Sequence, residues 1–82
     1  MDTMEHDEAQ ILYESFLDAR YIRQKLDILH KIRRLGYLTD KMITDFSVTL
    51  DIVVEGRDLD ERYYDLLRCM ESMARFETTG LR

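Results

Sequence analysis

The chain has 82 residues, of which 45% are hydrophobic and 35% charged, with a formal net charge of -5. This length holds a single domain, residues 1–82, and the hydrophobic content excludes a wholly disordered chain. A lone cysteine, Cys69, excludes an intramolecular disulfide, and no cysteine–histidine cluster offers a zinc site. Uninterrupted apolar runs reach only three residues, far short of the roughly 20 that span a membrane. We therefore expect a soluble, cytoplasmic protein with no membrane contact.

The first predicted helix covers residues 7–35. Good helix formers fill this segment, and Lys31, Arg33 and Arg34 come just before Gly36. Cations in the last turn interact favourably with the helix dipole, and glycine adopts the left-handed conformation that ends many helices. With no proline anywhere in the chain, Gly36 is the first strong signal for a helix end.

Two rows of apolar residues lie on nearly opposite sides of this predicted helix. One row comprises Leu12, Phe16, Ala19, Ile22, Leu26 and Leu29, and the other comprises Tyr13, Leu17, Tyr21, Ile28, Ile32 and Leu35. A helix with two apolar faces needs two sets of neighbours, and the rest of this short chain covers the second face only in part. The second row therefore predicts a homodimer or a protein partner. The alternative is that both faces are buried in one monomer, as the central helix of a three-helix bundle.

The second predicted helix, residues 39–55, has a competing interpretation. Thr39 can cap its N-terminus, and Met42, Ile43 and Phe46 begin a helical apolar stripe. Residues 46–52, however, alternate between apolar and polar as a half-buried strand does. A single strand needs a partner for its backbone groups, and no other stretch alternates convincingly, so a helix is predicted. The choice between helix and strand stays open for residues 46–54, and a strand there would most readily pair with the same strand of a second copy.

The third predicted helix covers residues 58–77. Asp58 is a good N-cap with Glu61 three residues later, as in a capping box. Apolar residues then recur in steps of four and three, as in a helix packed against others: Leu59, Tyr63, Leu66, Met70 and Met73. The three segments predict an all-α fold, a small three-helix bundle with a long N-terminal helix that dimerises through that helix.

Residues with catalytic or ligand-binding chemistry are sparse. His6 and His30 lie at opposite ends of the first predicted helix, and neither has a serine or cysteine nucleophile at a motif spacing. The acids around Asp58 lack the spacing of an EF-hand, and three separate glycines do not form a phosphate-binding loop. We therefore expect no enzyme activity, no metal and no cofactor.

Charge is distributed unevenly along the chain. Residues 1–19 hold six acids and neither lysine nor arginine, whereas residues 20–34 hold six cations against Asp27. Four of those cations share about 80° of the predicted helix circumference: Arg20, Arg23, Lys31 and Arg34. This basic flank could contact phosphates, but the chain as a whole is acidic and Asp27 interrupts the flank. Ion pairing with acids of neighbouring helices is the favoured interpretation.

These patterns favour a small non-enzymatic regulatory or adaptor protein that binds another protein through a helical surface. The predicted contact residues are the second apolar row and the basic flank, namely Tyr13, Leu17, Tyr21, Ile28, Ile32, Arg20, Arg23, Lys31 and Arg34. The alternative is a nucleic-acid-associated regulator that uses the basic flank in a dimer, where four cations become eight. Nucleic acid is the less favoured partner of the two.

Overall fold

The computed structural model describes the backbone of residues 2–80 and the side chains of residues 7–77. Within residues 2–80 there are four helices, α1 (Asp2–Asp18), α2 (Ile22–Leu35), α3 (Asp40–Thr49) and α4 (Leu59–Gly80). No strand occurs between residues 2 and 80. The predicted all-α class is therefore confirmed, whereas the predicted number of three helices is wrong.

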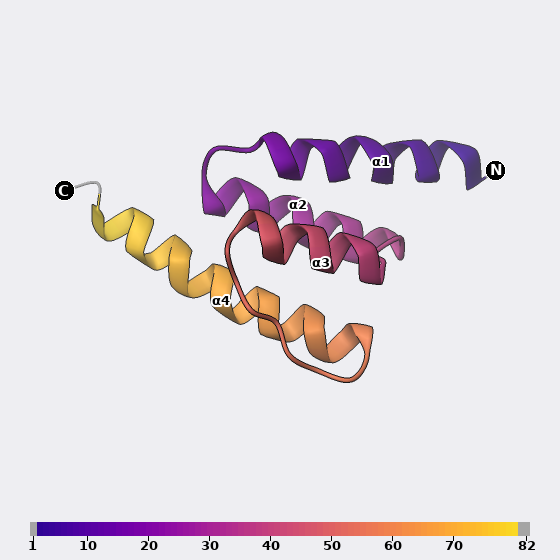
Figure 1. Ribbon diagram of the computed structural model, residues 1–82. Helices are drawn as coiled ribbons and strands as arrows, with labels where there is room; N and C mark the ends of the chain where they lie inside the picture. The colour runs from indigo at the N-terminus through magenta and orange to yellow at the C-terminus, as the bar shows by residue number, and fades with distance from the viewer. Residues whose placement is uncertain (1, 81–82) are drawn as a thin grey trace.

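The predicted long helix over residues 7–35 is wrong because the chain turns back between Asp18 and Ile22. Figure 1 shows α2 running antiparallel along α1. The turn, residues 19–21, contains neither glycine nor proline, so no local signal dictates it. Folding back brings residues of both apolar rows, such as Phe16 and Ile32, into one core. Tertiary packing thus overrides helix propensity here.

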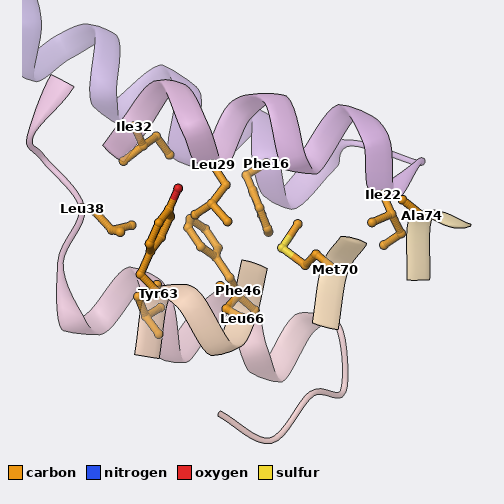
Figure 2. Packing of buried hydrophobic residues seen from close by; sticks show 11 residues of the cluster. Phe16, Ile22, Leu29, Ile32, Leu38, Phe46, Tyr63, Leu66, Met70 and Ala74 are labelled. Carbon is orange, nitrogen blue, oxygen red and sulfur yellow. The ribbon is translucent and has the colours of Figure 1, made fainter. Parts of the chain in front are cut away.

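The four helices surround a single hydrophobic core. α1 packs against α2 and α3, and α4 packs against the same two helices from the other side. Figure 2 shows the buried side chains that meet between them, which include Phe16, Leu29, Phe46, Leu66 and Met70. The rings of Phe16 and Phe46 stack with their centroids 3.8 Å apart, and both side chains are fully buried.

Three predicted helix boundaries are confirmed by their hydrogen bonds. The Met42 N–H donates to Thr39 Oγ1 over 3.2 Å at the start of α3. The Glu61 N–H donates to Asp58 Oδ1 over 2.9 Å at the start of α4. Gly36 ends α2 in the left-handed conformation, with φ of +81°. Side-chain caps thus begin α3 and α4, and a glycine ends α2, as the sequence predicts.

The second predicted helix, 39–55, ends six residues early, at Thr49. Asp51 adopts a left-handed conformation with φ of +57°, and the Ile52 N–H donates to the Ser47 carbonyl over 2.8 Å. Residues 52–56 form an irregular connection in which Ile52 and Val54 pack on the core while Val53 is exposed. The open choice between helix and strand over residues 46–54 is therefore resolved as helix up to Thr49, followed by a turn and an irregular connection. The last helix ends at Gly80, three residues later than predicted.

Candidate interaction surface

The five apolar residues predicted to contact a partner do not share one surface. Ile32 is fully buried in the core, so the assignment of Ile32 as an accessible contact is corrected. Ile28 is half-buried and packs against the same core. Leu17 and Tyr21 are exposed, by 38% and 54%. The break between α1 and α2 divides the predicted face because it reverses the direction of the chain.

Tyr13 joins α1 to α3 through a small polar network. Its hydroxyl donates a hydrogen bond to Asp45 Oδ2, and Lys41 Nζ lies 2.8 Å from the same oxygen. The hydrogen bonds from Lys41 and Tyr13 lower the pKa of Asp45. The hydrogen bond to Asp45 and the burial of the phenol raise the pKa of Tyr13. Tyr13 therefore has an intramolecular role in this structure.

Lowering the pH is expected to destabilise the fold in part through Asp45. Because its pKa is lower in the folded chain than the ordinary 3.8, its contribution is present above that ordinary value and is lost as the pH falls through the lowered pKa. Asp45→Asn is therefore expected to reduce the free energy of unfolding more at pH 7 than at pH values below the lowered pKa. Urea unfolding of the wild type and the variant at both pH values measures this difference. Asp27→Asn, at an exposed residue, is the control, and an equal loss for Asp45→Asn at both pH values would contradict the assignment.

The predicted basic flank is exposed but divided between two segments. Arg20 lies in the turn, whereas Arg23, Lys31 and Arg34 lie on the exposed side of α2. None of the four forms an ion pair with another side chain between residues 7 and 77. The expected pairing with acids of neighbouring helices therefore does not hold for them. It holds for Arg33, whose Nη2 lies 2.7 Å from Asp60 of α4.

A shallow depression runs between α1 and α2 on the side facing away from α4. Its lining comprises Ser15, Asp18, Ala19, Gln24, Asp27, Ile28 and Lys31. Ile11 lies one turn before Ser15 on the same side of α1 and is 63% exposed. We call this surface the outer face and define it as Ile11, Ser15, Asp18, Gln24, Ile28 and Lys31. It combines an exposed and a half-buried isoleucine with charged and polar side chains.

The two helices of the outer face carry opposite charge. α1 contains six acidic residues and neither lysine nor arginine. α2 contains five cations against the single acid Asp27. At the depression itself, Asp18 of α1 and Lys31 of α2 are both lining residues, and Asp27 of α2 lines it as well.

Lys25 and Glu77 hold the turn between α1 and α2, and neither was predicted from the sequence. Lys25 is only 6% exposed, and its Nζ donates to the Phe16 carbonyl over 2.7 Å. Burial lowers the pKa of Lys25, and Asp18 opposes that shift. Glu77 of α4 accepts from the Ile22 N–H at 2.9 and 3.1 Å. A signal for Lys25 existed, since it lies four and seven residues before core residues Leu29 and Ile32 on one side of the helix.

Three further titratable side chains, Tyr63, His30 and Arg33, join α2 to α4. The Tyr63 hydroxyl lies 3.3 Å from His30 Nδ1, and the Arg33 guanidinium lies 4.9 Å from the centre of the Tyr63 ring. Burial raises the pKa of Tyr63. Within the described residues, no three His, Cys, Asp or Glu side chains gather in a way that could hold a metal ion. None of the described helices is both long and apolar enough to cross a membrane.

Comparison with protein-family models, with curated proteins and with solved structures found no match.

Proposed function

We propose that this chain is a small non-enzymatic adaptor or regulatory protein of the cytoplasm that binds another protein through its outer face. The observation that carries the proposal is Ile11, which is 63% exposed and lies one turn before Ser15 on α1. Ser15 and the half-buried Ile28 line the depression between α1 and α2. Apolar side chains bordered by polar ones are typical of a protein interface. The charged residues around them supply a polar rim.

The charge of the outer face favours a protein partner over nucleic acid. Lys31 could contact phosphates, but Asp18 and Asp27 line the same depression. A phosphate backbone that lay along this depression would be repelled by the two carboxylates. A protein surface with charges of both signs would complement Lys31 and the two carboxylates together.

We further propose that the working form is a homodimer. A chain of this size hides only about 60–65% of its unfolded surface in a monomer. Large apolar side chains remain exposed on several elements, among them Ile11, Val53 and Phe76. A second copy would bury apolar surface that the monomer leaves in water.

Ile11→Asp is expected to abolish partner binding without unfolding the chain. The substitution places a charge at the centre of the proposed contact, whereas loss of an exposed isoleucine changes the free energy of unfolding by only about 0.5 kcal/mol. The immobilised chain would be exposed to a nuclease-treated cell lysate, and the retained proteins would be identified by mass spectrometry. Val48→Asp, at a 74% exposed residue of α3, is the matched control.

The proposal expects proteins that the wild type and Val48→Asp retain and Ile11→Asp does not. Equal retention by all three chains would contradict it. Labelled duplex and single-stranded DNA test the alternative partner directly. Tight binding to either DNA that weakens steeply with salt would contradict the proposed protein partner and favour nucleic acid as the partner.

A further inference from the structure

The turn that separates α1 from α2 is made of residues that favour helix. It consists of Ala19, Arg20 and Tyr21, and alanine and arginine are among the best helix formers. Helical hydrogen bonding also extends into the turn from both sides. The Ala19 N–H donates to Ser15 over 2.8 Å, and the Tyr21 carbonyl accepts from Lys25 over 3.1 Å. The turn therefore contains no residue that opposes a continuous helix.

The hydrogen bonds that hold the turn each have a direct replacement in a continuous helix. The Phe16 carbonyl, which accepts from Lys25 Nζ, would instead accept the Arg20 N–H, four residues later. The Ile22 N–H, which donates to Glu77, would instead donate to the Asp18 carbonyl. The Tyr21 N–H, which donates to Gln24 Oε1 over 3.4 Å, would likewise donate to the Leu17 carbonyl. Straightening the turn thus gives these backbone groups helical partners and releases the Lys25 ammonium and the Glu77 carboxylate from their bonds at the turn.

A straight α1–α2 helix would leave the site of α1 empty in its own copy. That site is made by α2 and α3, and it includes the ring of Phe46, on which Phe16 of α1 stacks. A second straightened copy could fill it with its own α1. Two such helices would lie antiparallel with their turns side by side, because α1 and α2 are already antiparallel in the hairpin (Figure 1). The packing contacts of the hairpin, including the acidic α1 against the basic α2, would then recur between copies. The bond from Lys25 Nζ to the Phe16 carbonyl would not.

We propose that this chain dimerises by exchanging α1 between two copies, with residues 19–21 as the hinge. The occupant of the α1 site is therefore a second copy of the same chain. Exchange of an identical element is a low-cost route to a dimer because it uses contacts that the monomer already has. This inference rests on the proposed homodimer but not on the binding of a partner at the outer face.

Glycine in the hinge tests the exchange. Ala19 and Arg20 lie outside the helices of the hairpin but inside the helix of the exchanged dimer, so Ala19→Gly with Arg20→Gly weakens only the dimer. The expected rise in the dimer dissociation constant is about 1,000-fold, roughly five-fold for each of the four glycines in the dimer. Light scattering coupled to size exclusion, run over a range of concentrations, measures it. Asp27→Gly with Lys31→Gly is the matched control, because both residues are exposed and helical in either form, and it is expected to leave the dissociation constant unchanged.

The position of α1 is measured directly in mixed dimers. Isotope-labelled and unlabelled chains would be unfolded and refolded together, and isotope-filtered NMR would record contacts between the rings of Phe16 and Phe46. Exchange predicts that these contacts join a labelled chain to an unlabelled one.

Three results would overturn the exchange. These are a wild-type chain that is monomeric at every concentration, a dimer whose dissociation constant the hinge glycines leave unchanged, and a dimer with Phe16–Phe46 contacts only within each chain. The last two would leave the outer face and its Ile11→Asp test intact. Conversely, partner binding that Ile11→Asp leaves unchanged would contradict the proposed function but not the exchange of α1.

Discussion

Phe46→Ala is expected to remove a large part of the free energy of unfolding. Phe46 is fully buried, its ring stacks on Phe16 at 3.8 Å, and the Tyr13 ring lies 5.6 Å away. Truncating such a side chain costs about 3–5 kcal/mol through lost burial and the cavity left behind. An 82-residue domain has a total stability of only about 4–12 kcal/mol.

Urea unfolding followed by far-ultraviolet circular dichroism measures this loss. Val48→Ala is the matched control, since Val48 lies on the same helix, α3, and is 74% exposed. Its expected change is within about 0.5 kcal/mol. Similar losses for the two variants would show that α1 and α3 do not meet at Phe46.

The apolar pattern predicted most of the core but not its topology. Phe16, Leu29, Leu66 and Met70 belong to rows that the sequence analysis identified, and all four are fully buried. The turn at residues 19–21 could not be predicted because neither glycine nor proline marks it. It exists because reversal of the chain lets Phe16 and Ile32, on opposite rows, reach one core. The burial gained in this way depends on contacts between residues far apart in the sequence, and helical periodicity carries no information about such contacts.

The candidate surface was predicted less well than the core for the same reason. The contact surface predicted for one straight helix included Ile32 and omitted Ile11. With the turn at residues 19–21, Ile32 is fully buried and Ile11 is 63% exposed. Lys25 could have been found, because a lysine in phase with Leu29 and Ile32 on α2 must find a buried acceptor. Glu77 could not, since its bond to the Ile22 N–H joins residues 55 positions apart.

Gly56→Ala is expected to reduce the free energy of unfolding by about 3 kcal/mol, the upper part of the range for a residue forced into a strained backbone conformation. Gly56 has a φ of +152°, and an added Cβ would lie 2.9 Å from Glu61 Cβ and 3.1 Å from the Arg62 backbone nitrogen. These atoms belong to the first turn of α4, which the bond from the Glu61 N–H to Asp58 fixes. Relief of the clash would therefore have to move the start of the helix.

Gly36→Ala separates the effect of the clash from that of backbone conformation. Gly36 also has a left-handed φ, +81°, but an added Cβ there meets no atom within 4 Å. Gly36→Ala is expected to reduce the free energy of unfolding by about 1 kcal/mol. The left-handed conformation costs a residue with a Cβ about 1–2 kcal/mol, and the lower conformational entropy of the unfolded alanine variant offsets part of that cost. Urea unfolding of both variants gives the difference. Equal losses would mean that the connection at residues 52–56 moves freely relative to α4, so that contact with Glu61 and Arg62 does not constrain Gly56.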